Sequence, residues 1–144
     1  MTQAMNEVQS EVGHLFSDIP GKTATILLIE DEEAIVDLVK SVLELEGYNV
    51  LVALDGEQAL SLFAQHQDEI DLIVSDLDLP RMKGDEVYIE IRKKNPDIKI
   101  LFASGYIDDY MRTYLQALGV KEFVDKPYHP FQILNCIKSM LGAN

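Results

Sequence analysis

The chain has 144 residues, the size of a single domain that can bury a hydrophobic core. Its formal net charge of −13 argues against direct binding to nucleic acid, because an acidic surface repels a phosphate backbone. It has no apolar run of membrane-spanning length, no secretion signal and one cysteine, Cys136, so we expect no membrane insertion, no internal disulfide and a location in the reducing cytoplasm.

Residues 1–22 differ from the rest of the chain. They contain no strand-like run and end in Pro20-Gly21, which is a boundary signal. Four apolar residues nevertheless recur at helical spacing, namely Met5, Val8, Val12 and Leu15. We therefore interpret residues 1–22 as an N-terminal extension or linker, with a short helix that packs on a partner as the alternative, and residues 23–144 as the folded domain.

From residue 23 onward, short apolar runs alternate with amphipathic segments. In chain order the predicted elements are strand Thr25–Ile29, helix Ala34–Glu46, strand Tyr48–Ala53, helix Gly56–His66, strand Ile70–Ser75, helix Asp85–Asn95, strand Ile98–Ala103, helix Ile107–Ala117, strand Lys121–Val124 and helix Pro130–Leu141. Alternation with strands of this apolar kind indicates an α/β fold, an open five-stranded parallel sheet of flavodoxin-like type with helices on both faces.

Local signals add detail to these elements. The first helix is predicted to end before Gly47, and Asp85 is a candidate N-cap of the third helix. The apolar side of the first helix is predicted to hold Ile35, Leu38, Val39, Val42 and Leu45. Cys136 has the helical spacing of a core residue. A tyrosine recurs at every fourth position in Tyr106, Tyr110 and Tyr114, which is typical either of packing or of a partner surface.

In a parallel sheet the carboxyl ends of all strands share one edge, where such folds place their chemistry. The predicted strands bring Glu30, Asp31, Asp76, Ser104 and Lys126 to that edge. Clustered carboxylates repel one another and favour a bound cation, and oxygen ligands suit Mg²⁺, with Mn²⁺ also acceptable. A carboxylate beside a divalent ion can attack phosphorus, and a lysine and a hydroxyl can each bind a phosphoryl oxygen.

Four segments carry a resemblance to a known family. They are Ile26–Glu32, Leu72–Pro80, Ala103–Tyr106 and Asp125–Tyr128. With these segments in this order at strand ends, the chain resembles the response-regulator receiver domains of bacterial two-component signalling, from about residue 23 to residue 141. The N-terminal extension and the wording Ser104-Gly105-Tyr106 are similar to receivers attached to hybrid histidine kinases.

The resemblance implies a role for each acidic residue. Asp76 is the expected phosphoacceptor and also a ligand of Mg²⁺. Asp31 is the expected direct metal ligand, and Glu30, where the family often has aspartate, acts on the metal largely through water. The backbone carbonyl of Asp78 is a further expected ligand.

The resemblance also implies a switch. Ser104 is the expected switch hydroxyl, and Lys126 is expected to contact the phosphoryl group and to form a cis peptide bond with Pro127. Phe123 stands where the switch aromatic is frequently tyrosine. A phenyl ring can still turn inward, but it has no hydroxyl with which to donate a hydrogen bond.

The implied function is a phosphoacceptor signalling switch that catalyses its own phosphorylation and slow dephosphorylation. A histidine kinase or a histidine phosphotransfer protein is the expected phosphodonor. Phosphorylation is expected to change binding to an unknown output protein through the face of the fourth helix, fifth strand and fifth helix, and homodimer formation stays open. Because the sequence ends just after the last helix, we expect no output domain to follow, so that the domain either acts through other proteins or is one piece of a larger chain.

Two other functions would use the same residues differently. Asp76-Leu77-Asp78 after a strand imitates the paired aspartates of a Mg²⁺-dependent phosphohydrolase of haloacid-dehalogenase type. That motif normally opens its domain, however, and the chain has no cap region to enclose a substrate. The other alternative is an interaction module that works without phosphorylation, against which the complete set of acids, hydroxyl and lysine counts.

Overall fold

The computed structural model describes residues 23–142, so the expectations for residues 1–22 lie outside the described part. The strands are β1 (Thr25–Ile29), β2 (Asn49–Ala53), β3 (Ile70–Asp76), β4 (Lys99–Ser104) and β5 (Glu122–Asp125). The helices are α2 (Glu33–Leu45), α3 (Gly56–His66), α4 (Gly84–Lys94), α5 (Asp109–Ala117) and α6 (Pro130–Gly142). Strands and helices alternate as predicted, and the observed ends lie within two residues of the predicted ones.

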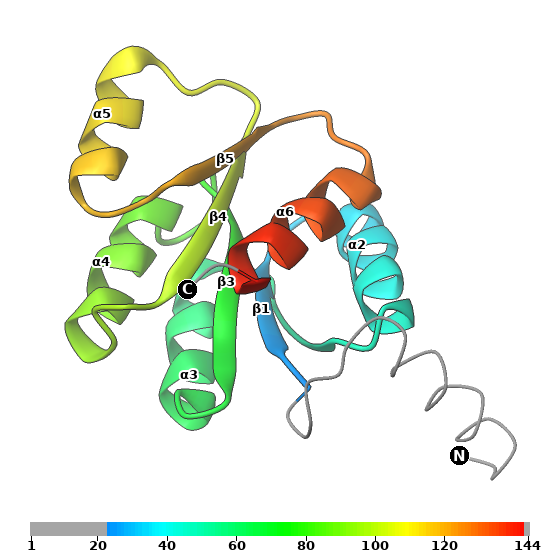
Figure 1. Cartoon of the computed structure of the whole chain (residues 1–144). Coiled ribbons are helices and arrows are strands. Elements are labelled where there is room, and N and C mark those ends of the chain that lie inside the picture. Colours follow the sequence, from blue (N-terminus) through cyan, green and yellow to red (C-terminus); the bar gives the residue numbers. More distant parts are fainter. Residues whose placement is uncertain (1–22, 143–144) are drawn as a thin grey trace, which may run out of the picture.

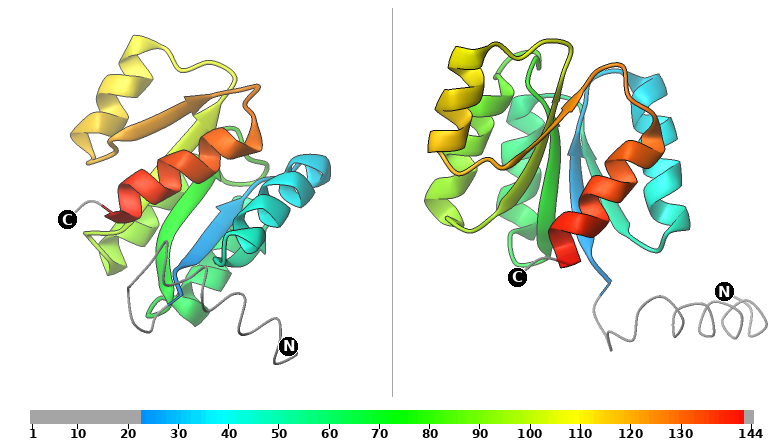
Figure 2. Two further views of the ribbon diagram at one scale, coloured as in Figure 1. Left: turned by 45° about the vertical axis from the view of Figure 1, so that its right-hand side comes forward. Right: turned by 45° about the horizontal axis from the view of Figure 1, so that its top comes forward.

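The five strands form one parallel sheet in the order β2-β1-β3-β4-β5, which confirms the predicted open flavodoxin-like sheet. Helices α2 and α6 cover one face, and α3, α4 and α5 cover the other (Figures 1 and 2). Strand β3 lies at the centre, so its carboxyl end is flanked by the carboxyl ends of β1 and β4. Within the described residues, no helix combines the length and apolar character that crossing a membrane requires.

Two apolar cores hold the helices on the sheet. The α2 and α6 side buries Val36, Val39, Leu43, Ile133, Leu134 and Ile137 against β1, β3 and β4. The α3, α4 and α5 side buries Ala59, Phe63, Val87, Tyr88, Ile91 and Leu115 against the same sheet. Strands that are covered on both faces read as continuous apolar runs, as the sequence of β1 does.

The apolar side predicted for the first helix is partly wrong. Leu38 is 59% exposed and Leu45 is 88% exposed. The stripe that faces the sheet is Val36, Val39 and Leu43. At 3.6 residues per turn, Leu38 and Leu45 lie roughly opposite Val36 around the helix, so the stripe cannot include them.

Side chains and glycine set several helix ends. Asp55 caps α3 by accepting a hydrogen bond from the backbone N–H of Gln58 at 2.7 Å. Gly47 follows α2 with φ of +100°, a left-handed conformation that glycine adopts at low cost, and so ends that helix as predicted. The N-cap predicted at Asp85 is wrong. Helix α4 begins one residue earlier than predicted, and Lys83 is its N-cap. Asp85 lies in the first turn, where its negative charge interacts favourably with the helix dipole.

Gly84 allows the start of α4 to approach the end of β3. A Cβ atom at this position would collide with the backbone carbonyl oxygen of Asp76 and would lie 3.0 Å from the Cα of Leu77. We expect Gly84→Ala to lower the free energy of unfolding by about 1–3 kcal/mol, because the backbone cannot move aside cheaply. Denaturant titration measures this change.

Gly142→Ala is the matched control, because a Cβ at that position meets nothing within 4 Å. It should leave stability unchanged or slightly raised, since alanine favours a helix over glycine. Equal stability of the two variants would contradict the close contact at Gly84.

Candidate functional site

The carboxyl edge of the sheet gathers the residues that the sequence places there. Asp76 is the last residue of β3, and Glu30 and Asp31 follow β1 directly. Lys126 follows β5, and the peptide bond between Lys126 and Pro127 is cis, as the resemblance implies. The structure thus brings four of the predicted site residues together.

Lys126 lies between two buried carboxylates. Its Nζ donates hydrogen bonds to Asp76 Oδ2 at 2.9 Å and to Glu30 Oε1 at 3.0 Å. Glu30 is 2% exposed and Asp76 is 6% exposed. Burial alone would lower the pKa of Lys126, but the hydrogen bonds to Asp76 and Glu30 outweigh it and raise the pKa above its usual range. Lys126 is therefore a permanent cation at neutral pH.

The contacts of Glu30 compensate the burial of its negative charge only in part. Burial raises its pKa, and the hydrogen bonds from the Glu32 backbone N–H, at 3.1 Å, and from Lys126 offset this only in part. The neighbouring charge of Asp76 raises the pKa further. A second cation near Glu30 would therefore stabilise its ionised form.

The carboxylates are arranged as a cation site. Glu30, Asp31 and Asp76 can each present an oxygen so that all three oxygens lie within 4.8 Å of one another. Asp31 is exposed, which leaves one side of the group open to water. Oxygen donors with access to water suit Mg²⁺, which keeps several of its waters in proteins. The side chain of Asp78 is exposed and lies outside this group, and the ligand role expected of its backbone carbonyl stays a prediction.

The backbone around Asp76 is fixed from several sides. The Asp78 backbone N–H donates to Asp76 Oδ1 at 3.0 Å, so each carboxylate oxygen of Asp76 has a donor. The hydroxyl of Ser75 donates to the Asp76 carbonyl at 2.9 Å. The Leu77 N–H donates to the Ala103 carbonyl at 3.1 Å. Together these bonds orient the Asp76 carboxylate toward Lys126.

Ser104 ends β4, and its hydroxyl serves the following turn. Its Oγ donates to the Tyr106 carbonyl at 3.0 Å and accepts from the Tyr106 N–H at 3.3 Å. Its own carbonyl accepts from the Lys126 N–H at 2.8 Å, which ties the end of β4 to the end of β5. The switch role of Ser104 stays a prediction, since it requires the hydroxyl to leave Tyr106.

Phe123 lies on β5, paired in register with Phe102, and is half-buried against the core on the α5 side. The guanidinium of Arg112, on α5, lies over the Phe123 ring with its central carbon 4.7 Å from the ring centroid. This is a cation–π contact. Arg112 was not identified from the sequence, because nothing in the order of residues indicates that a helix residue lies over a strand residue eleven positions later.

Tyr128 ends the segment Asp125–Tyr128 that carries the resemblance, but sequence reasoning gave it no role. It is half-buried, and burial followed by the negative charge of Glu30 raises its pKa to about 12. With Glu32 and Ile35 it lines a pocket of about 370 Å³ beside Lys126. Its position directly after Lys126-Pro127 is the signal that could have identified it.

Two further expectations can be compared with the structure. Tyr106 and Tyr110 are each 80% exposed and Tyr114 is 37% exposed, which favours a partner surface over packing. Cys136 is half-buried and packs against the core on the α2 and α6 side.

The chain is similar in sequence to known proteins. The model of the response regulator receiver domain family matches residues 26–138. The sensor kinase CckA of Brucella abortus is 38% identical over 125 residues, which cover 87% of this chain and 13% of the relative. The response regulator SaeR of Staphylococcus aureus is 28% identical over 116 residues, which cover 81% of this chain and 50% of the relative. The chain thus spans at most half the length of these relatives.

Solved structures agree with this match. The non-phosphorylated HemR receiver domain from Leptospira biflexa has a TM-score of 0.79 at 30% identity, covering 85% of this chain and 97% of the neighbour. A CheY-like receiver domain protein from Methanospirillum hungatei has a TM-score of 0.76 at 30% identity, covering 84% and 95% respectively. The chain therefore belongs to the response regulator receiver domain family, and its function is that of a phosphoacceptor signalling switch.

Proposed function

We propose that Asp76 accepts a phosphoryl group from a phosphohistidine, and that the modified domain binds another protein differently. The observation that carries this proposal is the Lys126 ammonium between Asp76 and Glu30, at the edge where Asp31 completes a set of three carboxylates. A carboxylate that is oriented in this way, with a cation beside it, is equipped to attack phosphorus.

Mg²⁺ is the proposed cofactor. The side chains of Glu30, Asp31 and Asp76 and the backbone carbonyl of Asp78 are its proposed ligands, with Glu30 acting largely through water. The ion would offset negative charge on the nucleophile and on the incoming phosphoryl group. The oxygen-only donor set supports this choice of metal.

The residues of the chain account for the transfer step. An oxygen of the Asp76 carboxylate forms a bond to phosphorus, the bond from phosphorus to the donor imidazole breaks, and the imidazole keeps the electron pair and takes up a proton. The Asp78 N–H and the Lys126 ammonium hold the two carboxylate oxygens in place beforehand. Lys126 then binds a phosphoryl oxygen. The domain thereby catalyses its own phosphorylation, and water slowly reverses it.

The phosphodonor is proposed to be a histidine kinase or a histidine phosphotransfer protein. The pocket that Lys126 lines supports this, because Ile35, Leu38 and Pro130 give it an apolar lining, and Lys126 also contacts Asp76. The exposure of Leu38, which packing does not explain, fits a surface that a donor protein covers. The single cysteine is in keeping with the proposed location in the cytoplasm.

The proposed response is a shift between two conformations. Ser104 would release Tyr106 and bind the phosphoryl group, and Phe123 would turn inward. These movements would change the face of α5, β5 and α6. The exposed Tyr106, just before α5, and Tyr110, in its first turn, are proposed to contact an output protein or a second copy of the chain. Arg112 is placed to follow the movement because it contacts the Phe123 ring.

The phosphohydrolase alternative is not favoured. The paired-aspartate motif needs the second carboxylate in the site, but the side chain of Asp78 is exposed and lies outside the three-carboxylate group. The family match also points to a receiver rather than to a phosphatase. A single phosphorylation per molecule, without turnover of phosphate esters, is the expected behaviour.

Asp76→Asn tests the proposal directly. Acetyl phosphate with Mg²⁺ should add the mass of one phosphoryl group to the wild-type chain and none to the variant, because the amide is not a nucleophile of comparable strength. Intact-mass spectrometry measures the adduct. Asp68→Asn, an exposed aspartate between α3 and β3, is the control and should be labelled like wild type. An adduct that persists in Asp76→Asn would refute the assignment.

The raised pKa of Glu30 predicts a pH dependence of stability. A carboxyl whose folded pKa lies above its ordinary value of 4.5 favours folding fully below that value. The contribution is lost as the pH rises through the folded pKa, when the buried group must ionise. In Mg²⁺-free buffer, the free energy of unfolding of Glu30→Gln relative to wild type should therefore rise as the pH increases from about 4.5 toward neutrality.

Denaturant titrations of both proteins at several pH values measure this difference. Saturating Mg²⁺ should reduce it, because a bound cation stabilises the ionised Glu30. A difference that stays flat, or that falls with rising pH in the absence of metal, would show that Glu30 is well compensated by Lys126 alone.

A further inference from the structure

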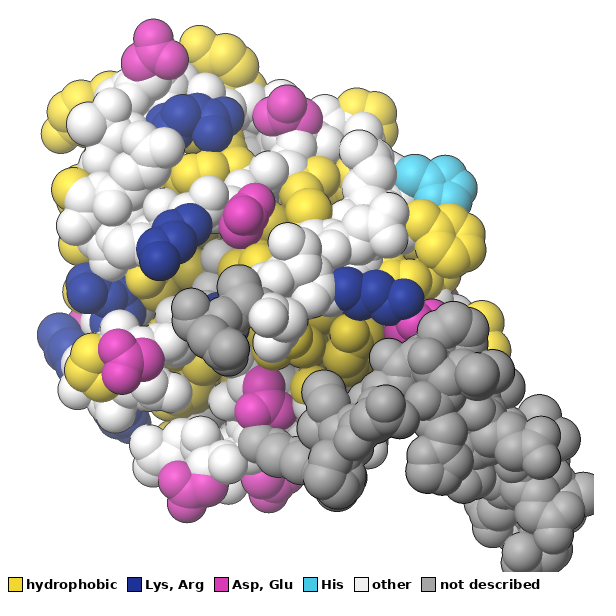
Figure 3. Space-filling model, in the orientation of Figure 1, with side chains coloured by type: hydrophobic (Ala, Val, Ile, Leu, Met, Phe, Trp, Pro, Cys, Tyr) yellow, Lys and Arg dark blue, Asp and Glu magenta, His cyan; other side chains and the backbone are white. Residues whose placement is uncertain are grey.

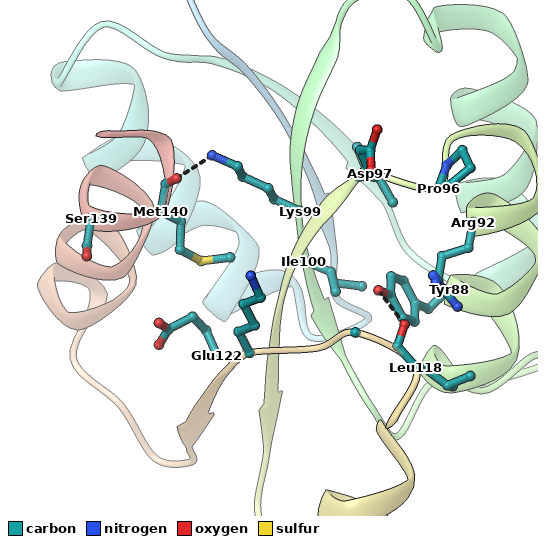
Figure 4. A pocket seen from close by; sticks show the side chains of 13 residues that line it. Tyr88, Arg92, Pro96, Asp97, Lys99, Ile100, Leu118, Glu122, Ser139 and Met140 are labelled. Carbon is teal, nitrogen blue, oxygen red and sulfur yellow. Dashed lines mark hydrogen bonds between the residues drawn. The ribbon is translucent and has the colours of Figure 1, made fainter. Parts of the chain in front are cut away.

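A second pocket opens at the opposite edge of the sheet from Asp76. It has a volume of about 350 Å³ and lies where β4 and β5 begin, at Lys99 and Glu122 (Figure 4). Its other walls come from the end of α4, from the turn between α5 and β5, and from the end of α6. This volume is at the lower end of the range of small-molecule sites.

The charge of this pocket differs from that of the chain. Arg92, Lys99 and Lys121 line it, against the two carboxylates of Asp97 and Glu122. The lining therefore carries three positive and two negative charges, whereas the whole chain has a net charge of −13. In Figure 3, Lys and Arg side chains lie on the left of the view, where Figure 1 shows α4 and the turn between α5 and β5. A locally positive hollow in an acidic protein attracts anions.

Arg92 forms no ion pair with any residue in the described range 23–142. Its guanidinium lies over the ring of Tyr88, 5.7 Å from the centroid, and Figure 4 shows the two side chains together on one wall. Within residues 23–142 its Nε is buried without a hydrogen-bond partner. A buried donor without an acceptor lowers stability, and an anionic oxygen that comes close to this unpaired guanidinium would be bound favourably. Lys121 likewise has no ion pair with any described residue.

Two other polar groups of the lining already have partners within the chain, and several lining residues are apolar. Lys99 Nζ donates to the Met140 carbonyl at 2.6 Å, and the Tyr88 hydroxyl donates to the Leu118 carbonyl at 3.4 Å (Figure 4). Ile100, Leu118 and Met140 contribute apolar surface between the cations. A ligand that fits must therefore combine an anionic group with a compact apolar body.

The geometry points to a binding site for a small organic oxyanion, a carboxylate or phosphate group on a compact apolar body, held by Arg92 and Lys121. The planar guanidinium of Arg92 can bind two oxygens of either group. The site lies at the amino ends of the strands and Asp76 at the carboxyl end of β3, so its lining shares no residue with the acidic site.

Nuclear magnetic resonance of the ¹⁵N-labelled wild-type chain in Mg²⁺-free buffer tests this site. Benzoate and phenyl phosphate are the two anionic probes, and their comparison shows which group the pocket prefers. Benzyl alcohol is the neutral control. We expect saturable shifts of the Ile100, Gly119 and Lys121 amides with at least one anionic probe, and about tenfold weaker binding of the alcohol, because the loss of charge-assisted hydrogen bonds removes most of the affinity.

Variants separate the pocket from general charge effects. Lys121→Gln changes an exposed residue and should weaken the binding of the anionic probe several-fold. The double variant Lys121→Gln with Arg92→Gln should weaken that binding about tenfold or more. Lys94→Gln, exposed on α4 and outside the lining, should bind as wild type does. The proposal is overturned by shifts that never saturate, by shifts only around Lys126, by equal binding of benzyl alcohol, or by variants that bind as wild type. None of these outcomes bears on the labelling of Asp76.

Discussion

The ammonium group of Lys126, held between the buried carboxylates of Asp76 and Glu30, is the interaction on which the site depends. Two buried negative charges this close would repel each other, and removal from water penalises each of them further. One lysine, 16% exposed at its side chain, compensates both, but the raised pKa of Glu30 shows that the compensation is incomplete. The excess negative charge of the site therefore favours the binding of one more cation. A phosphoryl group on Asp76 would offer Lys126 new oxygens to bind in place of the Asp76 carboxylate.

The scaffold makes this arrangement possible. In the strand order β2-β1-β3-β4-β5, the parallel strands place residues that are distant in sequence at neighbouring strand ends. The hydrogen bond from the Lys126 N–H to the Ser104 carbonyl then joins the end of β5 to the end of β4. Because Gly84 has no Cβ, the first turn of α4 can lie against the backbone carbonyl of Asp76. The residues proposed for the switch are thus in contact with the acidic group through Lys126, and Arg112 joins Phe123 to α5 by a cation–π contact.

The fold and the membership of the acidic edge could be predicted from the sequence, because apolar runs mark strands and strand ends share one edge. Several features could not. Leu38 and Leu45 suit a core by composition, and only the rotation of α2 shows that they point away from the sheet. The N-cap predicted at Asp85 was wrong because α4 begins at Gly84, and the close approach of Gly84 to the Asp76 backbone has no signal in the local sequence. The contact of Arg112 with Phe123 and the pocket around Arg92 arise from tertiary packing, which leaves no local pattern in the sequence.

The most direct test of the account is the stability and Mg²⁺ affinity of Lys126→Met. Without Mg²⁺, the variant should lose about 3–5 kcal/mol of unfolding free energy, because Glu30 and Asp76 are left as buried, unpaired charges. Mg²⁺ should bind the variant more tightly than wild type, since the ion no longer competes with the ammonium, and should restore much of the stability. Unchanged stability in metal-free buffer, or weaker Mg²⁺ binding, would contradict the claim that Lys126 holds the acidic site together.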